Sequence, residues 1–505
     1  MRGAGFWVAA WALGLAGCGT KPEAPKRPEA PFRGVKVRVG AVGEPAILKV
    51  INPQRGEWEQ TRGGTVEVVE EGVATKEAAG LDVVIFRADR LGELVDAGAL
   101  ATLPETVVAP SPAGRPSGGT EDSLKFTEVV PALREQVGRY GEDRMGVPLG
   151  ASALVLVYRR DALTSDANRE AADKAGLGAL EPPDSWERLD ALARFFQGRD
   201  WDGDGKLESG IALALGLDQE EGVADATFLA RAASVGQHPD QYSFVFDADT
   251  MAPRVAMPPF VEALEGLKAL AKCGPEGVID FDAEKARAAF RSGEVALLID
   301  RAERASRWAG KEVPITVGVA PLPDSKRVFD PDRKQWQDLP TRNRVSYLPV
   351  GGGWLAALGT GASSASKAAA VDFLRYLVAP DTATRVRGDV AFAMLPARGD
   401  LIGLGLPDPR SAPGVDARLW AAAVGMTLKG PRVVPGLRIP EADGYLADLA
   451  RGRVAAMKGA RAEAALNDVA RAWDDRTNRL GRDRQAWHYR RSLNALPTPP
   501  NPPSR

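Results

Sequence analysis

Apolar residues alternate with charged ones at the start of the folded part of the chain. Residues 35–40 read VKVRVG and residues 65–70 read TVEVVE, so every second side chain is apolar, as in a strand with one buried face. Residues 81–86 read LDVVIF, a continuous apolar run that is typical of a strand buried on both faces. Apolar residues at helical spacing lie between and after these runs. This order predicts a doubly wound α/β unit.

A second α/β region is predicted beyond this unit. Residues 153–158 read ALVLVY and residues 295–299 read VALLI, and both are apolar runs of strand length. Asp184 precedes a helical pattern of apolar residues from Trp186 to Phe196 and is expected to cap that helix. Residues 315–323, ITVGVAPLP, form a further strand pattern. We expect the chain to return to the first unit there.

The extreme N-terminus has the pattern of a bacterial lipoprotein signal peptide. Arg2 precedes an apolar run over residues 6–16, which is too short to span a bilayer. The run ends in LAGC, residues 15–18, where small residues precede a cysteine as in a lipobox. We therefore expect cleavage before Cys18 and acylation of its thiol, which would anchor the mature chain to a membrane. An ordinary signal peptide with a chance cysteine is the alternative.

These patterns divide the chain into segments. The proline-rich residues 19–34 are expected to form an extended tether, and the proline-rich C-terminus is expected to be disordered. The predicted segments are a signal peptide (1–18), a tether (19–34), the first unit (35–150), the second unit (151–309), a return to the first unit (310–350), a further part of the second unit with the C-terminal helices (351–490) and a tail (491–505).

Composition supports an exported protein with more than one globular unit. The chain holds 65 basic and 67 acidic residues, a net charge of −2, so no strong basic field points to a nucleic-acid partner. Cys273 is the only cysteine besides Cys18, so the fold must depend on its core and not on disulfides. A chain of 505 residues that is 44% hydrophobic is too long for one compact core.

Several longer stretches resemble one family, the extracellular solute-binding proteins of bacterial ABC importers, in its sugar-binding branch. The stretches occur in the family's order behind the lipobox pattern, and they cover nearly the whole mature chain. They are LDVVIFRADRLGELVDAGALATLPE (81–105), PPDSWERLDALARFF (182–196), FDAEKARAAFRSGEVALLID (281–300) and VGGGWLAALGTGASSASKAAAVDFLRYLVAP (350–380).

The resemblance implies an α/β, two-lobed periplasmic-binding-protein fold. Each lobe would be a doubly wound sheet with flanking helices, and the ligand cleft would lie at the hinge. It further implies a monomeric, extracytoplasmic protein, anchored by lipid, that captures a solute and delivers it to the permease subunits of an ABC transporter. A carbohydrate is the expected solute, and no cofactor is required. Whether the anchor lies in the inner or the outer membrane stays open.

Candidate contact residues follow the strands, because ligands in open α/β sheets bind outside the carboxyl ends of strands. On the first lobe these are Glu44, Arg87 and Asp89, and on the second lobe they are Asp300 and Arg301. Glu44 has an alternative role near a helix N-terminus, and the other four have an alternative role as surface ion pairs.

A glycine-rich turn adds a further candidate. Trp354 is expected to offer an aromatic face to a sugar ring, and Gly352 and Gly353 are expected to let the backbone approach the ligand closely. A core position for Trp354 under the turn is the alternative. The chain also departs from the family, because DRAERA follows residues 295–299 and no aromatic residue occurs until Trp308. A charged or non-sugar ligand is therefore a second expectation.

The stretch DWDGDGKLESG, residues 200–210, is a candidate calcium loop. Positions 1, 3, 5, 6 and 9 of an EF-hand pattern are matched, but position 12, where a bidentate glutamate is needed, is Ile211. An acidic turn without metal is the alternative. The candidate calcium ligands are Asp200, Asp202, Asp204, Lys206 (through its backbone carbonyl) and Glu208.

The chain carries no sequence signature of an enzyme. Its two histidines, His238 and His488, lie in unlike contexts and in no metal-binding spacing. No nucleophile elbow, P-loop or dinucleotide fingerprint occurs. We therefore expect a binding protein and not an enzyme. A glycosidase needs only two carboxylates, so it stays open as an alternative, as does a receptor that delivers its ligand to a sensor.

Overall fold

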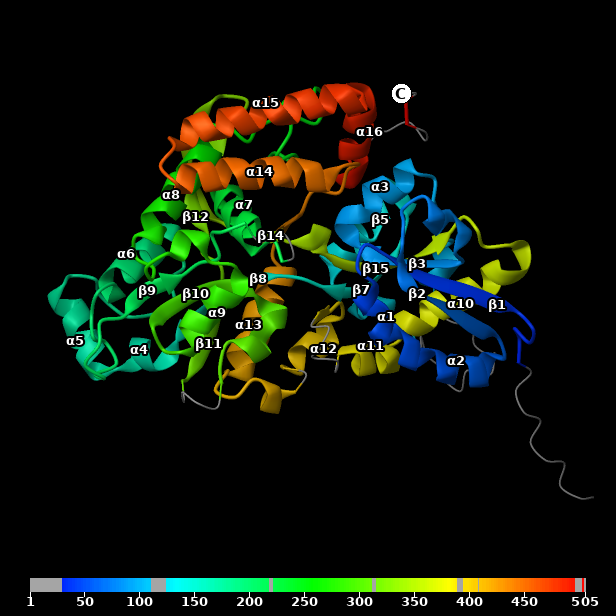
Figure 1. The fold of residues 1–505 in the computed structure, drawn as a ribbon, viewed down its shortest axis with the longest axis horizontal. Coiled ribbons are helices and arrows are strands. Elements are labelled where there is room, and N and C mark those ends of the chain that lie inside the picture. The colour runs from blue at the N-terminus through cyan, green and yellow to red at the C-terminus, as the bar shows by residue number, and fades with distance from the viewer. Residues whose placement is uncertain are drawn as a thin grey trace, which may run out of the picture.

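Two α/β lobes lie side by side in the computed structural model, which describes residues 30–109, 124–217, 221–310, 315–387, 394–406, 408–495 and 502–503 (Figure 1). The two-lobed fold predicted from the sequence is confirmed. The signal peptide, Cys18 and most of the tether lie outside the described residues.

The first lobe is built on a seven-stranded sheet. Its strands are β1 (Lys36–Val42), β2 (Thr65–Val73), β3 (Val83–Arg87), β4 (Leu100–Ala101), β7 (Val147–Ala151), β15 (Gly353–Gly359) and β16 (Leu395–Pro396). The order is β16–β7–β15–β3–β1–β2, with β4 paired to β15. β1 is parallel to β2 and β3, whereas β15 is antiparallel to β3 and β7. The flanking helices are α1 (Leu48–Ile51), α2 (Arg55–Arg62), α3 (Leu91–Asp96), α10 (Ser364–Val378), α11 (Pro380–Arg387) and α12 (Gly399–Gly403).

The second lobe is built on a four-stranded sheet in the order β11–β8–β10–β9. Its strands are β8 (Leu154–Arg159), β9 (Ser209–Ala212), β10 (Val295–Arg301) and β11 (Val317–Pro321). Its helices are α4 (Arg160–Thr164), α5 (Asp166–Lys174), α6 (Trp186–Phe196), α7 (Val223–Gly236), α8 (Pro258–Ala271), α9 (Ala283–Arg291) and α13 (Ala417–Leu428). Ser185, and not Asp184 as predicted, caps α6, because its hydroxyl accepts the backbone N–H of Arg188.

Short strand pairs complete the fold. They are β5 (Arg139–Tyr140) with β6 (Asp143–Arg144), β12 (Ser325–Asp330) with β13 (Gln335–Asn343), and β14 (Val345–Leu348) with β17 (Arg432–Pro435). β14 and β17 run in parallel directly before the chain enters β15 and α14 (Ala442–Met457).

The predicted return of the chain to the first lobe at residues 310–350 is wrong. β11 pairs with β8 in the second sheet, from Val317–Arg159 to Pro321–Val155. The return is made later by β15, whose residues are all buried between β3 and β7. A strand buried on both sides in mid-sheet needs a continuous apolar run, which GWLAALG supplies better than VGVAP. The segment predicted for the second lobe at 351–490 is consequently divided, and β15, α10, α11 and β16 belong to the first lobe.

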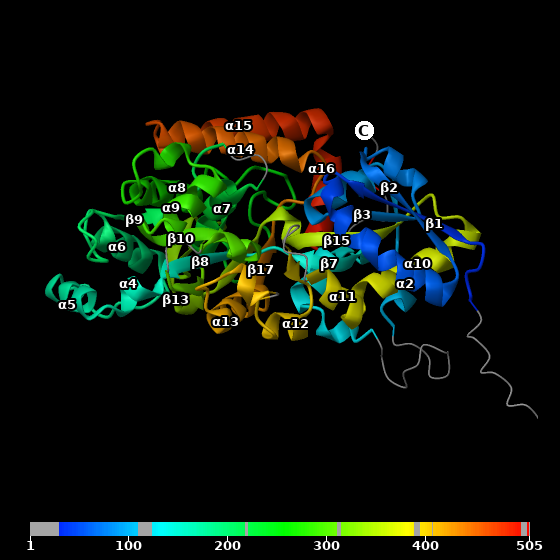
Figure 2. The ribbon, with the colours of Figure 1, turned by 60° about the horizontal axis from the view of Figure 1, so that its bottom comes forward.

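Three C-terminal helices join the lobes. α14 and α15 (Ala462–Leu480) pack on α7 and α8 of the second lobe, and α16 (Arg482–Ser492) contacts β5 on the first (Figure 2). The apolar stripe of α15 is buried as expected at Leu466, Val469 and Trp473. Because α16 continues to Ser492, residues 491–492 belong to a helix and not to the predicted tail. No helix of the described residues is long and apolar enough to cross a membrane.

Candidate functional site between the lobes

The carboxyl ends of β1 and β3 lie next to each other, because the two strands pair in parallel up to Val42 and Phe86. Glu44, Arg87 and Asp89 follow these ends, so the structure brings together the three contact residues predicted on the first lobe. Arg87 Nη2 lies 2.5 Å from Asp89 Oδ2. Burial lowers the pKa of Arg87, but the neighbouring carboxylates, Asp89 first, outweigh it and raise that pKa overall.

This ion pair leaves two buried polar atoms free among the described residues. Asp89 is 5% exposed, yet its Oδ1 accepts no hydrogen bond, and Arg87 Nε donates none. Buried polar groups in native proteins are nearly always hydrogen-bonded. An acceptor and a donor at one strand end therefore suit a group that can both donate and accept.

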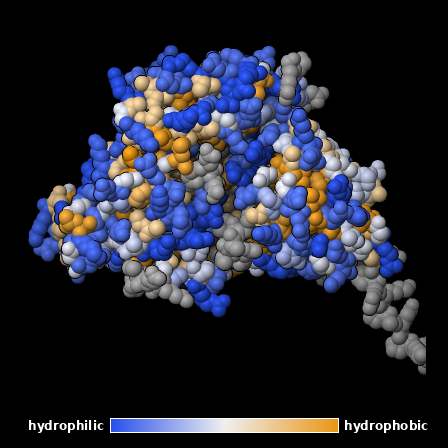
Figure 3. Space-filling model, viewed as in Figure 1, coloured by the Kyte–Doolittle hydropathy of each residue, from blue (hydrophilic) through white to orange (hydrophobic). Residues whose placement is uncertain are grey.

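The second lobe adds a carboxylate to this edge. Asp443 lies in the first turn of α14, and its carboxylate lies 2.8 Å from Arg90 Nη2 on the first lobe. Burial and then Asp89 raise the pKa of Asp443, against the opposing effect of Arg90. Figure 3 shows mainly hydrophilic residues along the line where the lobes meet on this face. The edge is thus charged on both sides.

A second polar cluster lies where the chain first crosses between lobes. Ser152, between β7 and β8, donates its hydroxyl to Glu303 Oε1 at 2.5 Å. Arg301 Nε donates to the same oxygen at 2.8 Å. All three side chains are at least nine-tenths buried. Arg301 is therefore near the junction of the lobes, as predicted, but it is engaged by Glu303.

Asp300 is placed differently from the prediction. It is 1% exposed, and its oxygens accept hydrogen bonds from Arg287 at 2.7 and 2.8 Å and from the indole of Trp308 at 2.7 Å. Because β10 continues to Arg301, Asp300 is not beyond the strand end but inside the sheet. It supports the second lobe and offers no surface to a ligand.

The glycine-rich turn serves the fold of the first lobe. The φ angles of Gly351, Gly352 and Gly353 are +66°, +110° and +139°, a region that favours glycine. A Cβ on Gly353 would lie 2.2 Å from the carbonyl oxygen of Gly150. The close approach is therefore to the protein's own backbone. Trp354 is 5% exposed within β15, so it has the core position named as the alternative.

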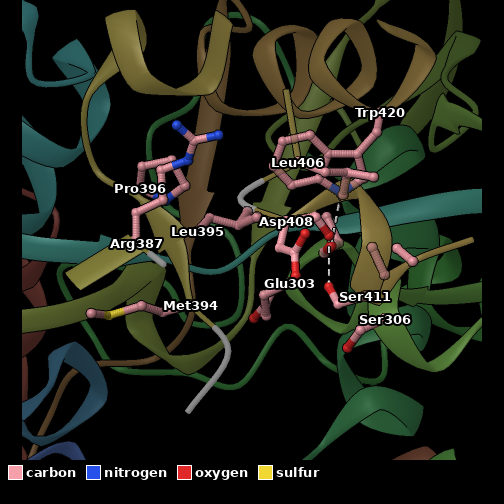
Figure 4. Close-up of a pocket in the computed structure, with 13 residues that line it drawn as sticks. Glu303, Ser306, Arg387, Met394, Leu395, Pro396, Leu406, Asp408, Ser411 and Trp420 are labelled. Atoms are coloured by element: carbon pink, nitrogen blue, oxygen red, sulfur yellow. Dashed lines mark hydrogen bonds between the residues drawn. The ribbon is translucent and has the colours of Figure 1, made fainter. Parts of the chain in front are cut away.

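A small pocket lies between the lobes beside Glu303 (Figure 4). Arg387 and Pro396 of the first lobe form one wall, while Leu406 and Trp420 lie across from them. The indole of Trp420 donates to the carbonyl of Ala302 at 2.9 Å. The pocket has about 30 Å³ of space, enough for about two waters. A sugar would fit here only after the lobes move apart.

Comparison with known sequences decides the family. The profile described as bacterial extracellular solute-binding protein matches residues 59–400, which is more than half of the chain. The chain belongs to this family. Its members are binding proteins that act outside the cytoplasm. No curated protein sequence matches the chain.

Solved structures show the same fold at low sequence identity. A solute-binding protein of an ABC transporter from Agrobacterium radiobacter K84, in complex with ribitol, has a TM-score of 0.59 at 20% identity, over 88% of this chain and 99% of that one. Maltose-bound MalE3 of T. maritima has a TM-score of 0.57 at 20% identity, over 87% and 99%. A solute-binding protein from Agrobacterium vitis S4 with bound D-mannitol has a TM-score of 0.56 at 18% identity, over 88% and 99%.

The acidic loop of this solute-binding protein gathers four carboxylates. One oxygen from each of Asp200, Asp202, Asp204 and Glu208 lies within 4.8 Å of the others. The aspartates are exposed, whereas Glu208 is 7% exposed and accepts the backbone N–H of Trp201 at 3.0 Å. Burial, and then the three aspartates, raise the pKa of Glu208 despite the Trp201 bond. The side chain of Lys206 pairs with Asp204 at 2.9 Å.

Four residues that lie where the lobes meet were not predicted from the sequence: Arg90, Ser152, Glu303 and Asp443. The strand-end rule that found Asp89 could have found Arg90 and Glu303, which lie one residue past Asp89 and two past Arg301. Ser152 follows the last residue of β7. Asp443 had no local signal, because only the packing of α14 brings it to the first lobe.

Proposed function

We propose that this solute-binding protein captures a carbohydrate or polyol between its lobes and delivers it to an ABC permease. The proposal rests on two buried atoms that make no hydrogen bond within the part of the chain that the structure describes, Asp89 Oδ1 and Arg87 Nε. A hydroxyl group is both donor and acceptor, so neighbouring hydroxyls of one solute would satisfy both atoms. Related folds bind ribitol, maltose and D-mannitol, which supports this class. The proposal includes a lipid anchor at Cys18 and a monomeric chain.

A charged solute is the second candidate. Glu303 and Arg304 follow β10 where the sequence departs from the family, and the first aromatic residue, Trp308, is buried. Arg304 Nε is also buried without a hydrogen bond among the described residues. A sugar acid would place its carboxylate on such a guanidinium. We therefore include sugar acids among the solutes to be tested.

Thermal unfolding of the mature chain, residues 19–505, tests the proposal against ribitol, D-mannitol, maltose and D-glucuronate. A solute present at 100 times its dissociation constant stabilises the native state by about 2.7 kcal/mol, so one of them is expected to raise the midpoint. Replacing Asp89 by asparagine is expected to weaken its binding about 10- to 100-fold, since hydrogen bonds to charged groups contribute most. Titration calorimetry measures that loss.

Asp468→Asn is the matched control, because Asp468 is exposed on α15. Equal affinity in both variants would contradict the role of Asp89, and no binding of any solute class would contradict the proposal. Recovery of the solute unchanged separates binding from hydrolysis, and a cleaved sugar would favour the glycosidase alternative.

We also propose that the acidic loop binds calcium as a structural ion. Ca²⁺ prefers several carboxylate and carbonyl oxygens, and the four gathered carboxylates with the carbonyl of Lys206 supply such a set. A cation would relieve the repulsion among the carboxylates. The proposal assigns the ion no part in solute binding.

Calcium is expected to raise the unfolding midpoint of the mature chain, and EDTA to reverse the rise. Glu208→Gln removes the buried ligand and is expected to abolish the effect, measured by calorimetric unfolding with and without calcium. Glu170→Gln, at an exposed position of α5, should keep it. A calcium effect of equal size in both variants would contradict a site at this loop.

A further inference from the structure

A large cavity lies under the C-terminal helices, and none of the contact residues predicted for the solute lines it. It has about 420 Å³ of space, a size typical of small-molecule sites. Its walls come from α14, α15 and α16, from the crossover strand β17 and from residues 135–136 of the first lobe. An occupant would therefore touch both lobes and the segment that joins them.

The walls are mainly apolar and aromatic. Six examples among the lining residues are Leu229, Phe244, Tyr347, Leu437, Leu446 and Trp473. Five of the six, all but Leu446, are buried in the core. Such walls suit a hydrocarbon or aromatic body. They suit a polyol less well, because hydroxyls that face these walls would lose their hydrogen bonds to water.

The charged part of the lining is mainly positive, with Arg432 and Arg438 against Glu135, and the other polar lining residues are neutral. Arg438 is 2% exposed, and its guanidinium donates, among the described residues, to the backbone carbonyls of residues 136, 137, 139 and 492. Arg432 donates to Asn343 and, among the described residues, has no ion pair. Glu135, the one acid that the described part of the chain places in the lining, is engaged by Arg134 at 2.6 Å and by Arg139 at 3.3 Å.

A buried charge is normally paired with an opposite charge. The buried guanidinium of Arg438 and the half-buried guanidinium of Arg432 have no carboxylate partner among the described residues, so the cavity favours an anion over a neutral molecule. Burial lowers the pKa of Arg438 to about 10, which leaves it charged at neutral pH. We propose that this cavity is a second ligand site, which binds a small amphipathic acid with an apolar or aromatic body and one anionic end. Contact with both lobes means that its ligand would favour the lobe arrangement seen here.

A matched pair of probes tests the charge requirement. 4-Phenylbutyrate and 4-phenyl-1-butanol share one apolar body, but only the first is an anion. Titration calorimetry on the mature chain is expected to show binding of 4-phenylbutyrate, at least about 10-fold tighter than 4-phenyl-1-butanol, because charge-assisted hydrogen bonds are the stronger ones. Equal affinities would overturn the anion assignment, and no binding of either probe would overturn the site.

Variants place the binding in the cavity. Leu446 on α14 is half-buried and lines the cavity. The larger side chain in Leu446→Trp would fill part of the cavity and is expected to abolish binding of 4-phenylbutyrate. Arg432→Gln is expected to weaken it about 10-fold, while Arg479→Gln, at an exposed position of α15, should leave it unchanged. Unchanged binding in Leu446→Trp would overturn the proposal. All three variants keep Asp89, so the binding of ribitol, D-mannitol, maltose and D-glucuronate to each of them tests the site between the lobes independently of this cavity.

Discussion

Replacing Asp300 by alanine is expected to lower the free energy of unfolding by about 3–5 kcal/mol, the usual cost of removing one partner of a buried ion pair. The Arg287 side chain is 2% exposed and is held by Asp300 and Glu221. Burial raises the pKa of Glu221, but Arg287 outweighs it and brings that pKa to about 2. Without Asp300, one face of the buried guanidinium and the indole of Trp308 lose their acceptor. Urea unfolding followed by tryptophan fluorescence measures the loss.

Asp468→Ala is the control for this result. Asp468 and its partner Arg471 are exposed, and exposed ion pairs contribute little to stability. Equal destabilisation by the two substitutions would contradict a buried role for Asp300. A second measurement separates support from ligand contact: Asp300→Asn, at a temperature where it is folded, should bind solute as the unmodified chain does, whereas Asp89→Asn should not.

The placement of Asp300 shows that an apolar pattern predicts a strand but not the residue at which the strand ends. The run VALLI predicted β10 correctly, but the pattern does not state where the strand ends, and two more residues, Asp300 and Arg301, continue it. A polar residue after an apolar run therefore looked like a strand-end contact when it was a buried ion pair. On the first lobe the rule placed Arg87 and Asp89 at a strand end, because β3 ends at Arg87, and their contact with a solute stays a prediction.

Sheet membership could not be predicted from local pattern. β11 and β15 are both short and mainly apolar strands, and their sequences do not state which neighbouring strands each one pairs with. β11 extends the second sheet at the edge of β8, and β15 fills the gap between β3 and β7. Contacts such as Arg90 with Asp443 join residues that are far apart in sequence. They depend on helix packing that no local periodicity encodes.

α16 fastens the C-terminal helices to the first lobe through a buried histidine. His488 is fully buried, and its Nδ1 accepts the hydroxyl of Tyr140 at 2.9 Å, while its Nε2 lies 2.9 Å from Asp96 Oδ1. One acceptor and one donor nitrogen match the neutral ring. The helix is thus attached to β5 and to α3 by one side chain.

Replacing His488 by leucine is expected to lower the free energy of unfolding by about 2–4 kcal/mol at pH 7, because the buried Tyr140 hydroxyl and the largely buried Asp96 carboxylate each lose a partner. The loss should come from polar contacts, since leucine restores most of the apolar volume. Arg490→Gln on the same helix is the control, because Arg490 is only half-buried and its ion pair is with the exposed Asp249, a kind of pair that contributes little to stability. Urea unfolding at pH 7 compares His488→Leu with Arg490→Gln.

The burial of His488 also leads us to expect that the free energy of unfolding depends on pH. Burial lowers the pKa of His488 below its ordinary 6.5, against the raising effect of Asp96. The unfolded chain therefore binds a proton at higher pH than the folded chain does, and stability should fall as the pH drops through about 6.5. Asp96 has a folded pKa of about 2, below its ordinary 3.8, so its contribution is lost only between about pH 4 and pH 2. Unfolding free energies at pH 7.5, 6 and 5 should show a decline in the unmodified chain that His488→Leu reduces. An equal decline in both chains would contradict a neutral, buried His488 as its source.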